Sequence, residues 1–284
     1  MDLSSWIVLR LRGSETRAFL QGLGTQDFEQ AVHGGACPTF FLNEKGRVIA
    51  LAWVQLPPDA AEAWVVADGG ARGVLRPHME RFRIMENVEF EGPDGMPRLI
   101  GLVGPERASL LRRFADSFPG AVALPADPIS FLLVPTEHAA NTSVDFIEPA
   151  AFEAWRLAVG LPLAGIDYDA ERIATELSYP AAISMAKGCY VGQEVVSRTT
   201  HRGKVRRRRV GFRFDWDGVT IPAGTEIHSG GVAAGFVTSA TREPDSEEGL
   251  GMGYLATETL DRRGEAMAID GPRIRRLRVR SWPL

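Results

Sequence analysis

Cysteine is scarce in this sequence of 284 residues, where only Cys37 and Cys189 occur. Two thiols cannot form a disulfide framework, and a single bridge between them is not expected. Proteins that carry so few cysteines are usually found in reducing compartments. The sequence therefore predicts a cytoplasmic location.

Signals for membranes and for secretion are also missing. No stretch approaches the ~18 uninterrupted apolar residues that a membrane-spanning helix needs. Residues 1–10 lack a basic start, and their apolar stretch ends at Arg10, which argues against a secretory signal. We therefore expect no membrane partner.

Common metal and nucleotide motifs are absent too. The five histidines are scattered, and neither Cys-x-x-Cys nor His-Glu-x-x-His spacing occurs, so no metal site is predicted. The sequence also has no Gly-x-x-x-x-Gly-Lys-[Ser/Thr] phosphate loop, which disfavours a nucleotide hydrolase.

The composition is that of an ordinary globular protein. Apolar residues make up 45% and charged residues 24%, with a formal net charge of −4, which excludes a largely disordered chain. The 30 glycines and 18 prolines favour many short strands and turns over long helical bundles.

Apolar patterning predicts several local elements. Two strand-like runs, at 37–42 and 47–54, flank a turn that contains Gly46 and therefore predict a hairpin. A short helix is predicted over residues 14–22, which Ser14 can cap and Gly22 can end. Another is predicted over residues 152–159, where apolar residues recur at helical spacing.

The longer-range order of elements predicts an α+β fold. Between residues 63 and 134 the order strand, helix, strand, strand, helix, strand is typical of a ferredoxin-like unit. After residue 204 short alternating segments are separated by turns, which predicts a small barrel or sandwich from about residue 205 to the end. The elements of the first region are strands 63–67, 84–91, 99–103 and 129–134, with helices 71–82 and 105–114.

The stretch from Lys187 to Glu194 is the most unusual part of the chain and reads Lys-Gly-Cys-Tyr-Val-Gly-Gln-Glu. Its two glycines let the backbone turn tightly or approach a ligand closely. Lys187 lies two residues from Cys189 and would favour the thiolate form. Gln193 and Glu194 offer donors and acceptors that suit a flat heterocycle with an amide-like edge. The alternative is a glycine-rich turn that contains a buried, inert Cys189.

A second unusual feature is a run of eight cations with no acid among them. Arginine forks match carboxylate or phosphate geometry, but the run lacks the aromatic interleaving of a stacking platform, which disfavours nucleic acid as a partner. Strand alternation would turn Arg207 and Arg209 away from Arg206 and Arg208, so a solvated strand explains most of the cations. One or two of them could still hold an anionic tail. The cations are Arg198, Arg202, Lys204, Arg206, Arg207, Arg208, Arg209 and Arg213.

Residues 187–194 closely resemble the signature of the YgfZ-type folate-binding proteins, which are relatives of the glycine cleavage T-protein, and match every fixed position of it. The resemblance extends upstream to residues 156–167 and, more loosely, to Glu176. Near the start of the chain, residues 11–27 resemble the family's opening segment, and Gly46-Arg47 resembles its Gln-Gly-Arg turn.

The resemblance implies a T-protein-like ring of three domains, with a ferredoxin-like middle domain and a small β-barrel at the C-terminal end. In these terms the chain divides into a discontinuous folate-binding domain of residues 1–58 plus 136–204, a ferredoxin-like domain of residues 59–135 and a barrel domain of residues 205–284. The last two agree with the strand order and turn spacing described above.

The resemblance also implies a function: a tetrahydrofolate-binding accessory protein for the assembly or repair of iron–sulfur clusters. Its partners would be a folate, namely tetrahydrofolate or a derivative, and iron–sulfur proteins or assembly factors. Cys189 corresponds to the functional thiol, with Lys187 beside it. Carboxylates would accept from the aminopyrimidine, cations would hold the glutamate tail and Tyr190 would line the channel. The candidate folate-binding residues are Lys187, Tyr190, Gln193, Glu194, Glu176, Arg198 and Arg202.

Three other functions stay open. A folate-dependent aminomethyltransferase or demethylase needs an acid near the reactive nitrogen, yet residues 46–52 carry none of the aspartates that follow the first hairpin glycine in the T-protein. Gln193 also replaces an arginine of the T-protein pattern. Whether the chain is an enzyme is therefore left open; it would be a transferase if it is one. A redox protein that acts through Cys189 alone would need partner thiols, and the arginine run is the basis for a nucleic-acid-binding module.

Overall fold

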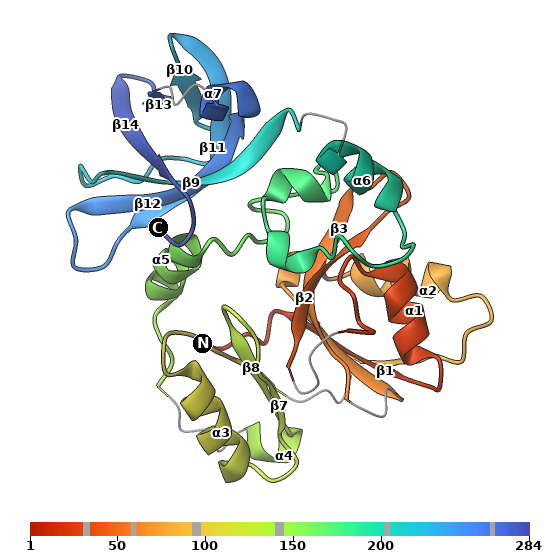
Figure 1. Ribbon diagram of the computed structural model, residues 1–284. Helices are drawn as coiled ribbons and strands as arrows, with labels where there is room; N and C mark the ends of the chain where they lie inside the picture. Colours follow the sequence, from red (N-terminus) through yellow and green to blue (C-terminus); the bar gives the residue numbers. More distant parts are fainter. Residues whose placement is uncertain (31–34, 58–60, 93–97, 140–144, 202–204, 262–264) are drawn as a thin grey trace. The chain divides into compact units, whose positions relative to one another are not determined.

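The computed structural model describes residues 1–30, 35–57, 61–92, 98–139, 145–201, 205–261 and 265–284 (Figure 1). Its contacts divide the chain into two compact units. The first unit contains residues 1–146 and 179–193, and the second contains residues 147–178 and 194–284.

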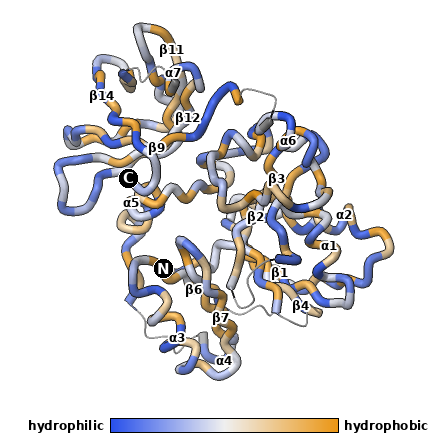
Figure 2. Tube along the Cα trace, viewed as in Figure 1, coloured by the Kyte–Doolittle hydropathy of each residue, from blue (hydrophilic) through white to orange (hydrophobic). Residues whose placement is uncertain are grey.

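The first unit is built on a five-stranded antiparallel sheet with the strand order β2-β3-β4-β1-β5. The predicted hairpin is confirmed, because β2 pairs with β3 across the turn that contains Gly46. Figure 2 shows that β3 is hydrophobic along most of its length, as expected of a strand covered on both faces. The strands are β1 (Ile7–Arg12), β2 (Cys37–Leu42), β3 (Val48–Gln55), β4 (Glu62–Ala67) and β5 (Glu89–Glu91).

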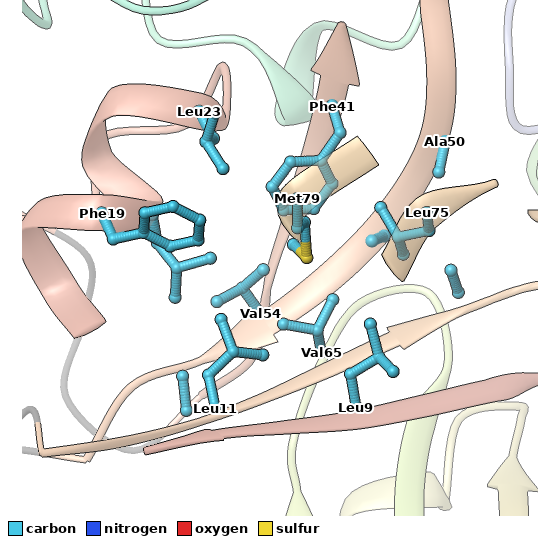
Figure 3. Packing of buried hydrophobic residues seen from close by; sticks show 14 of the residues in the cluster. Leu9, Leu11, Phe19, Leu23, Phe41, Ala50, Val54, Val65, Leu75 and Met79 are labelled. Carbon is cyan, nitrogen blue, oxygen red and sulfur yellow. The ribbon is translucent and has the colours of Figure 1, made fainter. Parts of the chain in front are cut away.

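One face of this sheet is covered by the helices α1 (Thr16–Leu23) and α2 (Leu75–Phe82). Phe19 from α1 and Met79 from α2 pack over apolar side chains of the strands, among them Val54 (Figure 3). Burial of large apolar side chains contributes about 1.5–3 kcal/mol each, so this cluster supplies much of the unit's stability.

The other face of the sheet carries aromatic contacts to a second, three-stranded sheet of order β6-β8-β7. The ring centroids of Trp6 and Trp53 lie 6.1 Å apart, and Trp53 lies 5.4 Å from Phe131 of β8. The remaining elements of the first unit are β6 (Arg98–Leu102), α3 (Arg107–Ser117), β7 (Val122–Leu124), β8 (Ser130–Val134), α4 (Thr136–Ala139) and the short 3-10 helices η1 (Gly69–Ala71) and η3 (Pro180–Ala182).

The region expected to be a single ferredoxin-like unit is arranged differently. The predicted order of elements is present, with β7 as an additional strand, but the strands are shared between two sheets. Because β4 pairs with both β1 and β3, and β5 pairs with β1, the first half of this region completes the N-terminal sheet. The described strands β4 and β5 therefore belong to the N-terminal sheet, and β6, β7 and β8 form the second sheet.

The strand predicted over residues 84–91 is mostly wrong. Only Glu89–Glu91 forms a strand, while Ile84 and Met85 are 86% and 91% exposed. The Glu86 carboxylate accepts hydrogen bonds from the backbone N–H groups of both residues, at 2.7 and 3.1 Å, and so fixes a turn in their place.

The second unit contains a closed six-stranded barrel with the strand order β10-β11-β12-β9-β14-β13. This confirms the barrel expected after residue 205. Helix α5 (Pro149–Val159) also confirms its prediction and ends at Gly160, whose φ of +78° suits glycine. The other elements are η2 (Ala174–Leu177), α6 (Gln193–His201), β9 (Arg207–Asp215), β10 (Glu226–Ser229), β11 (Val232–Arg242), β12 (Glu248–Ala256), α7 (Thr257–Asp261), β13 (Ala266–Asp270) and β14 (Arg273–Arg280).

The barrel strands are packed closely where glycines face phenylalanines. A Cβ at Gly251 would lie 2.1 Å from a ring carbon of the fully buried Phe212. We predict that Gly251→Ala lowers the free energy of unfolding by about 1–3 kcal/mol, because overpacking displaces that ring. Chemical denaturation of the full chain measures this, with Ala233→Ser at an exposed position of β11 as the control. Equal stability of the two variants would contradict the packing argument.

Candidate functional site

Lys187 of the signature segment is buried, and its ammonium group is held by backbone carbonyls of the first unit. Nζ donates hydrogen bonds to the carbonyl oxygens of Gln21, Gly24 and Gln26, at 2.7, 2.6 and 2.8 Å. The side chain is only 7% exposed. An ammonium group has three N–H donors, so all of them are used.

The local structure explains why this position attracts a cation. The carbonyls belong to the end of α1 and the turn that follows it, where helix carbonyls lack intrahelical partners and the dipole is negative. The rings of Phe28 and Tyr190 also lie near the ammonium, with centroids 5.7 and 5.2 Å from Nζ. Burial lowers the pKa of Lys187 to about 8, although Asp27 and Glu29 act in the opposite direction.

The residues after Cys189 are fixed to the same unit. The Val191 N–H donates to the Gly22 carbonyl at 3.1 Å, and the Val191 side chain packs against the main apolar cluster. Gly192 has a φ of +81°, and a Cβ there would lie 2.6 Å from the Asn43 carbonyl oxygen in the β2–β3 turn. Only glycine fits this combination of dihedral angle and close approach.

Tyr190 and Gln193 complete the loop. Tyr190 is buried, which raises the pKa of its hydroxyl to about 12, so the phenol is neutral at physiological pH. The Gln193 side chain donates a hydrogen bond to the Gly188 carbonyl at 3.3 Å and thereby bridges the loop on itself. Lys187 and Tyr190, which precede and follow the Gly188-Cys189 pair, therefore both have buried side chains.

Cys189 itself is exposed to solvent. The alternative of a buried, inert thiol is therefore wrong for this position. The other cysteine, Cys37, is half-buried in β2, where burial raises the pKa of its thiol. Of the two thiols, Cys189 is the one that a reactant in solution can reach.

The sequence predicted that Lys187 is a free cation beside the thiol, whereas its ammonium is bound to backbone carbonyls. With three carbonyls bound, no N–H is left for a thiolate or for a folate tail in this arrangement. The contacts give Lys187 a structural role, which is to tie the loop to the end of α1. Sequence reasoning missed the acceptors because backbone carbonyls leave no side-chain pattern; the one signal was the resemblance over residues 11–27.

The remaining candidate residues belong to the second unit. Glu176 accepts a hydrogen bond from the Ile173 N–H at 3.4 Å, within the short helix η2. Glu194 and Arg198 are exposed and pair with each other one turn apart on α6. Arg202 lies outside the described residues. Lys187, Cys189, Tyr190 and Gln193 thus lie in one loop of the first unit. Glu176, Glu194 and Arg198 belong to the second unit.

Two features are absent from the part of the chain that the structure describes. Within it, no helix is both long and apolar enough to cross a membrane. Within the same residues, no three or more histidine, cysteine or acidic side chains are grouped so that they could bind a metal ion.

Comparisons with known proteins agree with this architecture. The C-terminal barrel domain of the glycine cleavage T-protein matches residues 207–281. The tRNA-modifying protein YgfZ of Escherichia fergusonii is 24% identical over 289 residues, which cover 87% of each chain. An iron–sulfur cluster assembly factor, the mitochondrial IBA57 homologue of Pyricularia oryzae, is 28% identical over 229 residues. These similarities support a YgfZ-type, T-protein-like family.

The extent of these matches differs. The alignment with the IBA57 homologue covers 72% of this chain but only 55% of that relative, so the chain spans about half of its length. The crystal structure of aminomethyltransferase T from Bartonella henselae matches with a TM-score of 0.84 and 19% identity. That match covers 99% of this chain and 84% of the other, and it establishes the T-protein fold.

Replacing Lys187 tests its structural role. Lys187→Met removes three charge-assisted hydrogen bonds and leaves buried carbonyls unpaired, so we expect the free energy of unfolding to fall by about 2 kcal/mol or more. Chemical denaturation measures the change. Lys45→Met, at an exposed position of the β2–β3 turn, is the matched control and should leave stability nearly unchanged. A Lys187 variant as stable as the control would show that the ammonium is dispensable.

The lowered pKa of Lys187 predicts a pH dependence of stability. Because the folded-state value is about 8 and the ordinary value is 10.5, the unfolded chain binds this proton more tightly. The contribution of Lys187 to the free energy of unfolding should therefore rise with pH between about 8 and 10.5. As the pH falls through this range to 8, that contribution should be lost. The measurement is the difference in stability between the wild type and Lys187→Met across this range. A difference that stays constant with pH would contradict the assignment.

Proposed function

We propose that this chain is an accessory protein for the assembly or repair of iron–sulfur clusters that binds a reduced folate and acts through the Cys189 thiol. Two kinds of relative support the general role. One is named an iron–sulfur cluster assembly factor, and the other is named a tRNA-modifying protein. The proposal adds to these names a ligand and a reactive group.

The observation that carries the proposal is the contrast within the signature loop. Lys187, Tyr190, Val191 and Gly192 are buried or packed against the first unit, whereas Cys189 is exposed. A reactive thiol must reach its reactant, and it works best when its backbone is held in one place. A loop fixed on both sides of an exposed cysteine meets both requirements.

The thiol would serve a cluster as a transient ligand rather than as part of a permanent site. A four-iron cluster is normally bound by four thiolates, and the chain has two cysteines in all. The cluster is therefore a substrate here, and the client protein or an assembly factor would supply the other ligands. This limits Cys189 to one contact in a shared complex.

The described candidate residues suit the polar ends of a tetrahydrofolate. The aminopyrimidine presents N–H donors, for which the carboxylates of Glu194 and Glu176 are proposed acceptors. The glutamate tail is anionic, and Arg198 is its proposed partner; Arg202 is proposed for the same role from the sequence. Glu194 and Arg198 pair with each other on the surface, where an ion pair is weak enough to be exchanged for a ligand.

The signature loop would contribute the flat part of the site. Tyr190 supplies an aromatic ring, and Gln193 is an amide with a carbonyl acceptor and a second N–H besides the one bound to Gly188. Lys187 would act on folate only through the loop that it anchors. Folate binding in this proposal therefore depends on Lys187 as a positioning residue.

A folate-dependent transferase is the alternative, and the hairpin argues against it. Val48, Ala50 and Ala52, which follow Gly46, are at most 1% exposed and pack in the sheet. This segment offers no carboxylate to handle a proton at the folate nitrogen. Formation of methylenetetrahydrofolate from tetrahydrofolate and an aminomethyl-bearing carrier protein would nevertheless establish the transferase and overturn the accessory role.

The decisive experiment separates the thiol from the folate site. We expect Cys189→Ala to abolish complementation of a strain that lacks the chain's counterpart, while calorimetric titration with tetrahydrofolate stays within about twofold of the wild type. Cys37→Ala removes the other thiol and is the matched control, for which both functions should persist. Full complementation by Cys189→Ala would exclude the thiol, and the absence of tetrahydrofolate binding by the wild type would exclude the ligand.

A further inference from the structure

The arginine run of the sequence is divided between two environments in the second unit. Arg209 is buried, where its Nε donates to the Leu177 carbonyl at 2.6 Å and its guanidinium lies 4.2 Å from the Trp282 ring centroid. Arg206, Arg207 and Arg208 are exposed at the start of β9, which Figure 2 shows as strongly hydrophilic. Among the described residues, none of these three forms an ion pair with an acid.

Two aromatic side chains near these arginines come from the adjacent strands β11 and β12. Phe236 of β11 and Tyr254 of β12 stack with centroids 5.5 Å apart and an interplanar angle of 28°. The Arg207 guanidinium lies 5.9 Å from the Phe236 centroid. Arg172, which precedes η2, lies over both rings, at 5.4 Å from Phe236 and 4.8 Å from Tyr254. The barrel therefore supplies the aromatic interleaving that the linear sequence lacks.

These contacts place guanidinium groups over the rings, within cation–π distance. An arginine that is stacked on an aromatic ring loses little further freedom when its outer face meets a second flat group. Unpaired bases stack on guanidinium planes and aromatic rings, while neighbouring cations bind the phosphates between them. The pleat of β9 sets Arg208 on the opposite side from Arg207, and the exposed Arg206 directly precedes the strand, so cations gather at this end of it.

Nearby acids leave this positive charge largely intact. Glu226 lies opposite Phe236 in the β10–β11 ladder, but its carboxylate is bound to His228 at 2.9 Å. Asp169 approaches Arg172 only at 4.0 Å. At the far end of β9, by contrast, Arg213 is bound to Glu243 and Glu248.

We propose that the arginine ridge, defined as Arg172, Arg206, Arg207 and Arg208 together with Phe236, binds single-stranded RNA without strong sequence preference. An acidic protein segment would use the cations but not the flat guanidinium and aromatic faces, which is why RNA is favoured. This surface belongs to the second unit, and it uses none of the residues assigned to the thiol or to folate. The inference therefore stands or falls independently of the proposed function.

Fluorescence anisotropy with a labelled 12-nucleotide single-stranded RNA tests the ridge in the full chain. About three phosphate contacts give a salt slope near −2 for single strands, so we expect affinity to fall roughly 20-fold between 50 and 200 mM salt. The triple variant Arg206→Ser, Arg207→Ser, Arg208→Ser should lose most of the binding at 50 mM salt. Phe236→Leu should weaken binding at least threefold without a change in net charge, because it releases the stacked guanidinium groups.

A charge-matched control separates the ridge from general electrostatics. The triple variant Arg242→Ser, Arg273→Ser, Arg276→Ser removes three exposed cations elsewhere on the barrel and should bind RNA within about twofold of the wild type. Equal losses in the two triple variants, or wild-type binding to a 12-residue polyglutamate as tight as to RNA, would overturn the proposal. So would negligible RNA binding at 50 mM salt. Circular dichroism and tetrahydrofolate titration of each variant confirm that the fold and the other site are intact.

Discussion

The buried ammonium of Lys187 is the interaction on which the signature loop depends. It satisfies three carbonyls at the end of α1 and so joins two segments more than 160 residues apart in sequence. Burying a charge is expensive even when polar partners replace the water. Here three carbonyls do so, and burial still lowers the pKa of Lys187 to about 8. The same interaction orders the loop and separates its residues into those that face inward and the one thiol that faces out.

The loop is fixed from a second direction by the β2–β3 turn. Gly192 touches that turn so closely that no side chain fits between them. The hairpin and the signature are thus parts of one structure, although the sequence separates them widely. This close contact gives a physical reason for glycine at both positions 46 and 192. Gly46 allows the tight turn, and Gly192 allows the signature loop to pack directly against that turn.

The apolar and turn patterns of short segments predicted the elements that depend on neighbouring residues in sequence. The hairpin, α5 with its glycine end and the strand-rich barrel follow from alternation, helical spacing and turn residues. The sharing of β1 between β4 and β5 does not, because strand pairing over long sequence distances leaves no local pattern. Ile84 was assigned to a strand because it is apolar, but the Glu86 carboxylate holds its backbone in a turn.

The candidate site shows the same division. The exposure of Cys189 and the positive φ of Gly192 suit a functional loop, as the motif suggested. A lysine is among the residues least often fully buried, so a solvent-facing Lys187 was the reasonable expectation. Its actual role depends on carbonyl groups that any sequence possesses. The division of the arginine run into a buried strut, Arg209, and exposed neighbours likewise depends on what the neighbouring strands and Trp282 bring to it.

The stacked indoles of Trp6 and Trp53 have a spectroscopic consequence. Both are buried between the two sheets of the first unit, with centroids 6.1 Å apart. Chromophores at such a separation share their excitation, and their mutual orientation gives rise to a circular dichroism signal that free tryptophan lacks. The protein therefore contains an intrinsic optical reporter of the packing at the face of the five-stranded sheet where Trp6 and Trp53 meet, and no label is needed to read it.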